Sequence, residues 1–403
     1  MGTSPQTVTG LTHADFAAGC SSVDIACMSR ARELARLGAG RTWTNPMVGA
    51  VVVRDGEVVA SAYHRRLGEA HAETLVLAAA GNRARGATLY VSLEPCAHHG
   101  HTPPCVESVL AAGIERVVIP APDPDARVAG LGIETLRARG VHVDVGCGAA
   151  HAILDNHGYY HDRLGMARTV TLKIATSLDY KVSRAPGQRD RITGDPAQLD
   201  THRLRAVQDA IVIGATTARV DRPLLDCRLL EAGVDHEPAI VVFDTELSLA
   251  SDATWPAPGR DYVVVCRGDA DESRARMIEA RGGRVVRCRP FGRLVDVNDA
   301  LEKLGALGFR RILVEGGAHL MMSFVMAQAW DALWHYQSHE QFGPGGVGVN
   351  ALPTWGLAVD EMPLGDDTRR RYVHAASWER LTAALGERTS TAAGRTNDVH
   401  GHR

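Results

Sequence analysis

The sequence predicts two α/β domains in succession, and three observations support this. A chain of 403 residues exceeds one ordinary domain, so two domains are expected. Strand-like apolar runs alternate with helical runs along most of the chain, which is typical of a sheet covered by helices. Residues 146–168 are polar with aromatics and separate the two alternations. We therefore expect an N-terminal extension (1–22), a first domain (23–150), a connection (151–167), a second domain (168–385) and a disordered tail (386–403).

Composition excludes several classes of protein. A formal net charge of −3 gives no electrostatic case for nucleic-acid binding. No run of about 18 apolar residues predicts a membrane span, and residues 1–24 lack the basic start and apolar core of a signal peptide. The eight cysteines are scattered, so disulfides are not expected. We expect a cytoplasmic protein that acts on a small molecule and forms a homo-oligomer of a size the sequence does not define.

Periodicity and turn residues predict the elements of the first domain. A helix is expected from about Asp24, ended by Gly38 and Gly40. The dipeptide Asp55-Gly56 predicts a hairpin turn between two strands. We expect the strands at 48–53, 58–62, 87–93, 116–120 and 141–145, and further helices at 72–80, 105–112 and 132–139.

One stretch of the first domain carries residues suited to metal chemistry. His71 and Glu73 form an H-x-E triplet, and Cys96 follows a proline after a predicted strand. These are parts of the zinc-deaminase signature, although Cys105 comes nine positions after the first cysteine instead of three. Catalytic zinc commonly takes three protein ligands and keeps a fourth position for water. We expect His71, Cys96 and Cys105 to bind zinc, and Glu73 to carry a proton from the water to the leaving ammonia.

Other interpretations of these residues stay open at this point. A single cysteine is more often a small buried hydrophobe, and a single H-x-E triplet occurs by chance. Three histidines between the two cysteines, His98, His99 and His101, could compete as ligands or line a polar loop. All the elements occur in order on a helix–strand–helix frame, which favours a metal site.

The spacing H-A-E, then E-P-C-x-H-x-G-x-T-P-P-C, resembles the deaminase half of the bifunctional riboflavin-biosynthesis deaminase/reductase family. The resemblance also includes G-R-T-W-T-N-P-M-V-G-A-V-V-V at 40–53, His64, Gly68 and the run Asp123–Gly132. It covers nearly all of residues 25–150 and implies a cytidine-deaminase-like α/β sandwich. It also implies that Asn45 helps to hold a pyrimidine, whereas Asn45 alone would be interpreted as a turn residue before Pro46.

The second half again alternates strands and helices. It lacks G-x-G-x-x-G, so a Rossmann dinucleotide site is not supported. A predicted strand runs directly into Gly316-Gly317 and a helix, where a phosphate could approach backbone amides, although a tight turn is the plainer interpretation. Arg205, Arg219, Arg222 and Arg228 would suit a phosphate ester or a solvated surface. We expect strands at 169–175, 210–214, 239–244, 262–266, 284–289 and 311–315, and helices at 195–206, 271–281, 296–307 and 318–329.

Several segments here, among them 171–179, 214–221 and 314–317, resemble the reductase half of the same family. That half is similar to dihydrofolate reductase in fold, and it uses NADPH to reduce the ribose of the deaminated intermediate to a ribityl chain. The resemblance implies cofactor contacts at Ala175, Arg191, Thr217, Asp221, Thr245, Gly316 and Gly317. It implies substrate contacts at Arg189, Arg205, Leu225, Arg228 and Glu315, besides Asn45 in the first half.

This half departs from the family at several of these places. Tyr180 stands where the family has glycine, and tyrosine cannot take all the backbone angles of glycine. Arg222 stands for a second aspartate, which reverses a charge near a phosphorylated substrate. Arg189, Arg191 and Asp226 replace the usual Ser, Trp and Thr, and the first half departs at Thr44 and at Asp125-Ala126, which replaces Asn-Pro.

The expected function is therefore that of a multifunctional enzyme, hydrolase and oxidoreductase, with Zn²⁺ and NADPH as cofactors. It would deaminate a phosphoribosylamino-pyrimidine and then reduce its ribose, in riboflavin biosynthesis. Two alternatives stay open: a paralogue in a pteridine-like or azapteridine secondary-metabolite pathway, and a deaminase whose second domain no longer reduces. An RNA-editing deaminase is disfavoured by the net charge.

Overall fold

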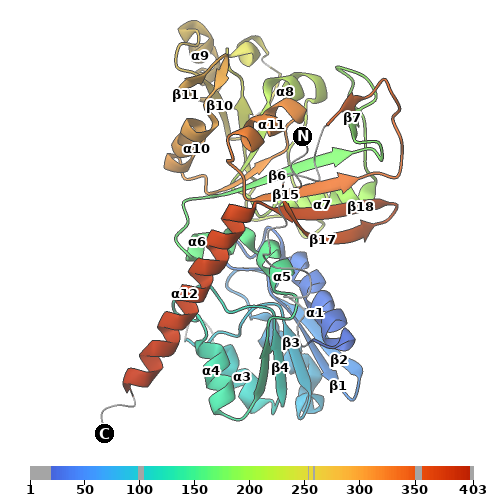
Figure 1. Ribbon diagram of the computed structural model, residues 1–403, viewed down its shortest axis with the longest axis vertical. Coiled ribbons are helices and arrows are strands. Elements are labelled where there is room, and N and C mark those ends of the chain that lie inside the picture. The colour runs from blue at the N-terminus through green and yellow to red at the C-terminus, as the bar shows by residue number, and fades with distance from the viewer. Residues whose placement is uncertain (1–19, 99–103, 253, 257–258, 350–355, 400–403) are drawn as a thin grey trace, which may run out of the picture. The chain divides into compact units, whose positions relative to one another are not determined.

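The computed structural model describes residues 20–98, 104–252, 254–256, 259–349 and 356–399, with side chains described up to Ser390 (Figure 1). Contacts between Cα atoms divide the chain into two compact units. The first comprises Met1–Gly38, Thr44–Leu164 and Ala383–Arg403, and the second comprises Ala39–Trp43 and Gly165–Thr382. Within the part of the chain that the structure describes, no helix is long and apolar enough to cross a membrane.

The first unit is built on a five-stranded sheet of order β2-β1-β3-β4-β5. Strands β3, β4 and β5 run parallel to one another, and β1 is antiparallel to both β2 and β3. The strands are β1 (Gly49–Arg54), β2 (Glu57–Tyr63), β3 (Thr88–Val91), β4 (Arg116–Ile119) and β5 (His142–Val145). The helices that cover them include α1 (Ser22–Ala35), α2 (Ala72–Ala80), α3 (Cys105–Ala111) and α4 (Leu131–Ala138).

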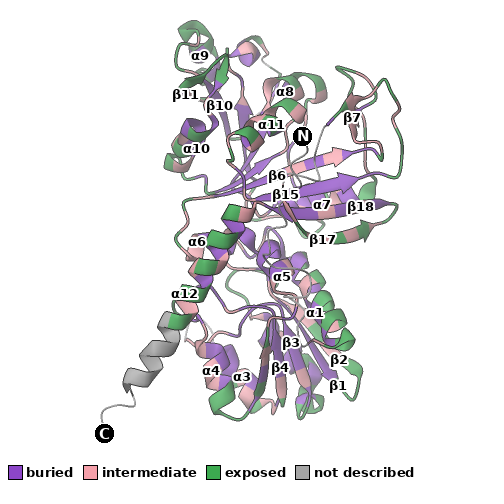
Figure 2. Ribbon diagram, in the orientation of Figure 1, coloured by how far each residue is buried: buried purple, intermediate pink, exposed green. Residues whose placement is uncertain are grey.

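Alternation along β1 gives this sheet two apolar faces. Val51 packs with Met28 of α1, whereas Val52 packs with Val76 of α2 and the residues of α3 and α4. The central strands β1, β3 and β4 are accordingly buried on both sides, as Figure 2 shows in purple, whereas the residues of the edge strand β2 are half-buried or exposed. Helix α1 approaches β1 so closely that a Cβ at Gly49 would lie 2.0 Å from the carbonyl oxygen of Ala31. The result is an α/β sandwich.

The connection predicted at 151–167 is different in the structure. Helices α5 (Ala149–Asp155) and α6 (His157–Arg163) occupy most of it and belong to the first unit. Their apolar side chains are buried, including Leu154 and Tyr160, so the segment contributes to a core instead of bridging two cores. The division between the units falls at Gly165.

The second unit contains a nine-stranded sheet of order β11-β10-β9-β8-β14-β6-β15-β18-β17. The first seven strands in this order, from β11 to β15, all run parallel to one another. Strand β18 runs antiparallel to both of its neighbours, β15 and β17. The strands are β6 (Thr169–Thr176), β8 (Ala210–Gly214), β9 (Ala239–Phe243), β10 (Tyr262–Arg267), β11 (Arg284–Cys288), β14 (Arg311–Val314), β15 (Ala332–Gln337), β17 (Leu357–Leu364) and β18 (Asp367–Val373). The helices are α7 (Asp195–Arg205), α8 (Ala215–Asp221), α9 (Glu272–Glu279), α10 (Val297–Ala306) and α11 (Ala318–Met326).

Helices cover both faces of this sheet too. One core joins Leu172 and Val314 to Leu301 and Phe324 of α10 and α11, and the other core joins strand residues to Leu204 of α7 and to α9. Short two-stranded ribbons accompany the sheet: β7 (Lys181–Ser183) with β16 (Val347–Gly348), and β12 (Pro290–Phe291) with β13 (Leu294–Val295).

The tail predicted to be disordered from residue 386 is largely helical in the structure. Helix α12 (Ala375–Val399) begins with buried side chains such as Trp378 and Leu381, and it continues to Val399. Alanines recur through this segment, and alanine has the most favourable helix propensity. Residues 400–403 lie outside the described residues.

Candidate active site

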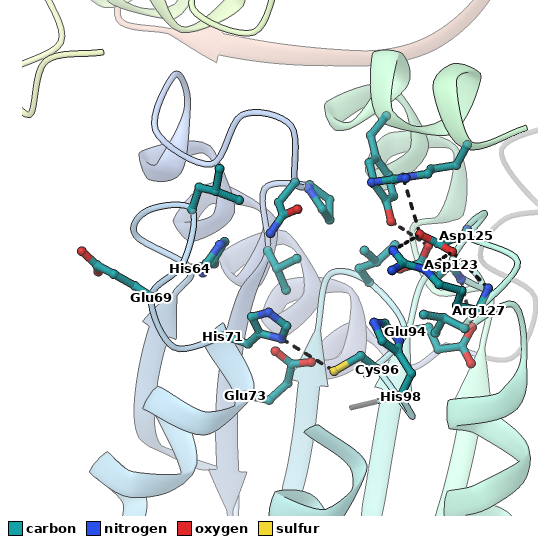
Figure 3. Close-up of a pocket in the computed structure, with 18 of the residues that line it drawn as sticks. His64, Glu69, His71, Glu73, Glu94, Cys96, His98, Asp123, Asp125 and Arg127 are labelled. Atoms are coloured by element: carbon teal, nitrogen blue, oxygen red, sulfur yellow. Dashed lines mark hydrogen bonds and ion pairs between the residues drawn. The ribbon is translucent and has the colours of Figure 1, made fainter. Parts of the chain in front are cut away.

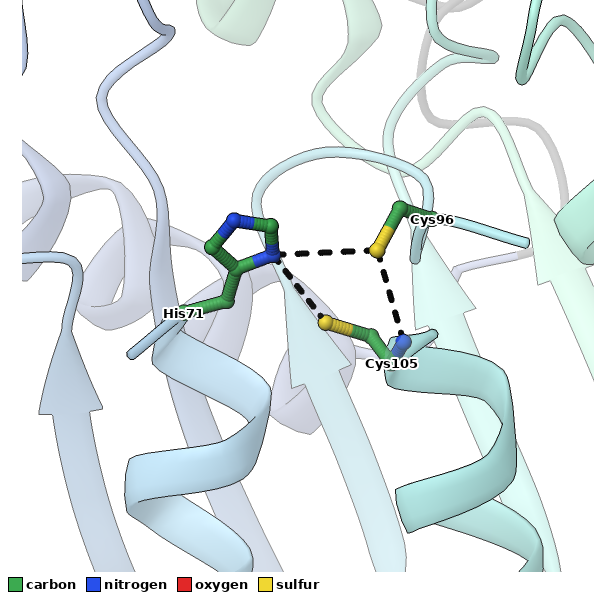
Figure 4. A group of neighbouring side chains, drawn as sticks. All are labelled: His71, Cys96 and Cys105. Atoms are coloured by element: carbon green, nitrogen blue, oxygen red, sulfur yellow. Dashed lines mark hydrogen bonds between the residues drawn. The ribbon is translucent and has the colours of Figure 1, made fainter. Parts of the chain in front are cut away.

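The three predicted zinc ligands come together at the start of two helices in the first unit (Figure 4). His71 is the N-cap residue of α2, and Cys105 is the first residue of α3. His71 Nδ1 lies 3.2 Å from the sulfur of Cys105 and 3.7 Å from the sulfur of Cys96. The ligand atoms all lie within 4.8 Å of one another.

These separations fit a tetrahedral zinc ion. Zinc at about 2.1 Å from nitrogen and 2.3 Å from sulfur places neighbouring ligand atoms roughly 3.6 Å apart. The donor set of one imidazole and two sulfurs also matches the preference of zinc. A hydrogen bond from the Cys105 thiol lowers the pKa of Cys96 to about 4, and the same bond raises the pKa of Cys105. A zinc ion bound here would hold both sulfurs as thiolates, because metal binding releases their protons.

Glu73 lies beside this group, on the first turn of α2. Its side chain is buried, and burial raises the pKa of the Glu73 carboxyl. A carboxyl group with a raised pKa can hold and release a proton near neutral pH, which suits a general acid–base residue. The structure therefore places the predicted proton carrier next to the predicted metal ligands.

A cavity of about 440 Å³ opens over the group (Figure 3). Asn45 lines it, as do His64 and His98, so Asn45 is in a position to contact a ligand. His98 lies outside the metal-binding group, and His99 and His101 lie outside the described residues. The cavity is lined by Asn45, Pro46, Val48, His64, Leu67, Gly68, Glu69, His71, Glu73, Leu93, Glu94, Cys96, His98, Asp123, Asp125, Arg127, Val128, Tyr159 and Arg163.

His64 presents an unfilled acceptor in this cavity. Its Nδ1 lies 3.1 Å from the carbonyl oxygen of Ala70, which can only accept, so Nδ1 carries the proton. The other nitrogen, Nε2, is buried and has no hydrogen-bond partner among the described residues. Burial lowers the pKa of His64, which favours this neutral form. His64 belongs to the family pattern quoted above. Nothing in the residues around it, however, indicated that its side chain would offer a hydrogen-bond acceptor to the cavity.

Glu94, in the E-P-C motif, holds the loop on the other side of the cavity. Its carboxylate accepts four backbone N–H groups, those of Asp123 (2.9 Å), Gly130 (2.9 Å), Gly132 (2.8 Å) and Ile133 (3.2 Å). A Cβ at Gly132 would lie 2.2 Å from the carbonyl oxygen of Pro95, so only glycine fits there. These contacts fix the backbone that carries Asp123.

The predicted cofactor residues lie in the second unit, near one edge of the large sheet. Parallel strands have their carboxyl ends at the same edge, and β9, β8, β14 and β6 are neighbours there. Ala175 lies at the end of β6, and Thr217 and Asp221 lie on α8, directly after β8. Thr245 follows β9, and Gly316-Gly317 follow β14.

The bare backbone at Gly317 fits an approaching phosphate. Gly317 is the N-cap residue of the nine-residue helix α11, and a Cβ there would lie 3.8 Å from the hydroxyl oxygen of Thr217. A helix N-terminus with glycine favours a phosphate group. The neighbouring residues therefore fit a nucleotide cofactor such as NADPH. Asp221 also lies near Arg189: burial raises the Asp221 pKa, and the Arg189 charge partly offsets this.

The four arginines expected to suit a phosphate already have partners. Arg205 forms a two-pronged ion pair with Glu315, at 2.6 and 2.9 Å. Arg219 donates to Ser248, Arg222 pairs with Asp252, and Arg228 pairs with Asp226. Arg191 pairs with Asp195 at the start of α7. Each guanidinium is thus held by a neighbouring acceptor, and a phosphate contact at these arginines stays a prediction.

Lys173 is a candidate functional residue that the sequence did not indicate. It lies on β6, and its ammonium is 3.9 Å from the Glu315 carboxylate. Burial lowers the pKa of Lys173, and the Arg205–Glu315 pair lies beside it. A buried lysine with a lowered pKa is typical of functional sites. The alternation of polar and apolar residues in T-L-K-I-A is typical of an ordinary half-buried strand. The sequence pattern therefore gave no reason to single out Lys173.

Comparisons with known proteins agree with the two-domain arrangement. The cytidine and deoxycytidylate deaminase zinc-binding region matches residues 21–121, and the RibD C-terminal domain matches residues 168–341. The riboflavin biosynthesis protein RibD of Bacillus amyloliquefaciens is 37% identical over 329 residues, covering 81% of this chain and 86% of that protein. RibD of Escherichia coli is 33% identical, over 81% and 90% of the two chains.

Solved structures show the same likeness. The Acinetobacter baumannii RibD has a TM-score of 0.60 at 30% identity, covering 87% of this chain and 98% of that chain. The deaminase/reductase of Thermotoga maritima has a TM-score of 0.62 at 27% identity, covering 87% and 99%. The predicted fold, a deaminase-like domain followed by a reductase domain, is confirmed. The order of the two domains, and relatives above 30% identity along most of both chains, show that this chain belongs to the RibD family of riboflavin biosynthesis proteins.

Proposed function

We propose that this chain deaminates a diaminohydroxyphosphoribosylaminopyrimidine and then reduces the ribose of the resulting 5-amino-6-(5-phosphoribosylamino)uracil, the two reactions that the name of the Thermotoga relative describes. It is a zinc-dependent deaminase joined to an NADPH-dependent reductase. The observation that carries the proposal is the convergence of His71, Cys96 and Cys105 on one point beside a buried Glu73.

At the deaminase site, the side chains of the chain bind and orient the pyrimidine. A zinc ion held by the three ligands supplies Lewis acidity, which activates water near neutral pH. Glu73 accepts a proton and returns it to the departing ammonia. Asn45 and the unprotonated Nε2 of His64 offer hydrogen bonds to the edge of the ring. Glu73 itself is buried, which keeps bulk water away from its carboxyl.

At the reductase site, a buried charge network faces the substrate. NADPH, when bound by Thr217 and the Gly316-Gly317 turn, supplies the reducing equivalents. The Glu315 carboxylate lies between Arg205 and Lys173, both of which are cationic donors. Because burial lowers the pKa of Lys173, this ammonium can donate a proton to a sugar oxygen.

A second candidate is a deaminase that no longer reduces the substrate of the family, and Tyr180 favours it. Tyr180 adopts a φ of 58°, the left-handed region that the glycine of the family occupies without strain. Its ring stacks on His335 at 5.9 Å. His335 hydrogen-bonds with Thr176, at the carboxyl end of β6, so the added ring lies close to the strand that carries Ala175.

Mass spectrometry of the products separates these candidates. With the diaminopyrimidine substrate alone, the protein should release ammonia and form the uracil product. Adding NADPH should add two mass units and convert the ribose to a ribityl chain. A deaminated product that NADPH leaves unchanged would support the second candidate, and an unchanged substrate would refute both.

Location and assembly are further parts of this proposal. The eight cysteines are all free thiols, which agrees with a reducing cytoplasm. Fractionation of cells that express the protein tests the location. A homo-oligomer stays a prediction, and a mass measurement of the native protein tests it.

A further inference from the structure

Two arginines from separate elements lie in the wall of the deaminase cavity. Arg127 belongs to the loop that Glu94 holds, and Arg163 is the last residue of α6. In Figure 3, Arg127 lies on the far side of the cavity from His71 and Glu73. A ligand that reaches from the metal ligands across this cavity therefore meets the arginine wall.

Asp125 fixes both arginines. Arg127 donates from Nε to one carboxylate oxygen at 3.0 Å, and from Nη2 to the other at 2.7 Å. Arg163 Nε lies 3.6 Å from the same carboxylate, and its guanidinium lies 5.4 Å from the centre of the Tyr159 ring. Tyr159 is fixed in turn, because its hydroxyl donates to Asp123 at 2.9 Å.

This arrangement leaves cationic donors facing the open cavity. Two guanidinium groups share one carboxylate, so the cluster carries a net positive charge. Asp125 turns inward, with 9% of its side chain exposed, whereas Arg127 is 63% exposed and Arg163 is 35% exposed. A guanidinium has five N–H donors, and Arg127 uses two of them on Asp125. The remaining donors can bind an anion.

The other acidic groups of the cavity do not cancel this charge. The Glu94 carboxylate accepts hydrogen bonds from four backbone N–H groups. Burial raises the pKa of the Asp123 carboxyl to about 7. Glu69 lies on the opposite side of the cavity in Figure 3. The arginine wall is thus the cationic end of the cavity, and the metal ligands form its reacting end.

We propose that Arg127 and Arg163 bind the phosphate of the ribose 5-phosphate group of the deaminase substrate, with Asp125 as the residue that positions both. The inference rests on the proposed function, and it explains how the deaminase site would select a phosphorylated substrate. Arginine forks match the geometry of phosphate oxygens, and such bonds are charge-assisted. The family usually has asparagine at position 125. An uncharged amide could not attract two guanidinium groups in this way, so the clamp belongs to the residues of this chain.

The test compares two substrates in the deaminase reaction of the full-length zinc protein. Ammonia release is measured without NADPH, from the phosphorylated pyrimidine and from the same compound after phosphatase treatment. Arg127→Leu and Arg163→Met should each lower kcat/KM for the phosphorylated substrate by about tenfold, mainly through KM, because they remove uniform binding. Both variants should keep the wild-type kcat/KM for the dephosphorylated substrate within about twofold.

Two control variants sharpen this test. Arg127→Lys keeps the charge but loses the fork, so it should recover part of the loss. Arg30→Met removes an arginine that is 58% exposed on α1 and pairs with Glu33 at 3.6 Å, and it should change neither substrate. The preference of the wild type for the phosphorylated substrate should also weaken with rising salt, because the donors are exposed.

The outcomes separate the inference from the proposed function. Equal losses on both substrates would mean that the arginines are only structural, and unchanged kinetics would mean that the phosphate binds elsewhere. Both results overturn the inference while the deaminase assignment stands. A wild-type protein that releases ammonia from neither substrate would refute the proposed function itself, and the inference with it.

Discussion

Replacing Glu73 with glutamine tests the proton transfer at the deaminase site. Glu73 is buried at the start of α2, and burial raises the pKa of its carboxyl, which suits a group that takes up and releases a proton. Glutamine has nearly the same shape but cannot carry a proton. Acid–base groups commonly contribute about 100- to 10,000-fold to a rate. The expected loss in kcat therefore corresponds to about 2.7–5.5 kcal/mol of transition-state stabilisation.

The assay measures ammonia release from the phosphorylated pyrimidine without NADPH. Bound zinc is measured on the same protein and should stay near one ion per chain, because the three ligands are unchanged. The melting temperature should shift by only a few degrees, since a neutral amide avoids the cost of burying a carboxylate. Glu107→Gln, an exposed position on α3, is the matched control. A kcat for Glu73→Gln within threefold of wild type, with zinc intact, would refute the proton-transfer role.

Four further substitutions probe three other parts of the molecule. Cys96→Ala or Cys105→Ala should each abolish stoichiometric zinc binding in metal analysis, and full occupancy in both would refute the ligand set. Glu315→Gln should destabilise the second unit by about 3–5 kcal/mol in urea unfolding, because it leaves a buried guanidinium without its carboxylate. Burial raises the pKa of Asp123 to about 7, so its stabilising protonation is complete below about pH 4 and is lost as pH rises through 7. Tyr159→Phe removes a hydrogen bond that favours the ionised form of Asp123, so it should raise the pKa of Asp123 further. In unfolding measured from pH 5 to 9, the loss of stability should then occur at a higher pH in the variant than in the wild type.

The metal site could be predicted from the sequence because its chemistry is local to the motifs. His71 and Cys105 are separated by 34 positions, but both stand at the first turn of a helix that follows a strand or loop. An α/β sandwich brings such helix starts to one edge of its sheet. Residue type, spacing and fold class were therefore sufficient to bring three candidate ligands together, with Glu73 beside them.

The arginine wall could not be predicted in the same way. The segment N-H-G-Y-Y-H-D-R resembles a polar connection, yet it folds as α6 and brings Tyr159 and Arg163 to the cavity. What ties it there is contact with distant residues. Asn156 exchanges two hydrogen bonds with the backbone of Met47, which is 109 positions away, at 2.8 and 2.9 Å. A single sequence carries no local sign of such a pairing.

The run D-T-R-R-R-Y-V, which forms β18, shows the same limit for the fold. Consecutive arginines are usually exposed, and no strand was expected here, but Arg369 and Arg371 are almost fully buried. Arg369 donates to Asp200 at 3.0 Å, across 169 positions of sequence, and Arg371 donates to Asp360 at 2.9 Å. Both guanidinium groups also lie over the Trp334 ring, at 4.9 and 5.2 Å. Buried charges persist only when each has a partner. The alternate residues Arg369 and Arg371 can therefore be buried on β18 because acidic residues and an aromatic ring from other elements contact them.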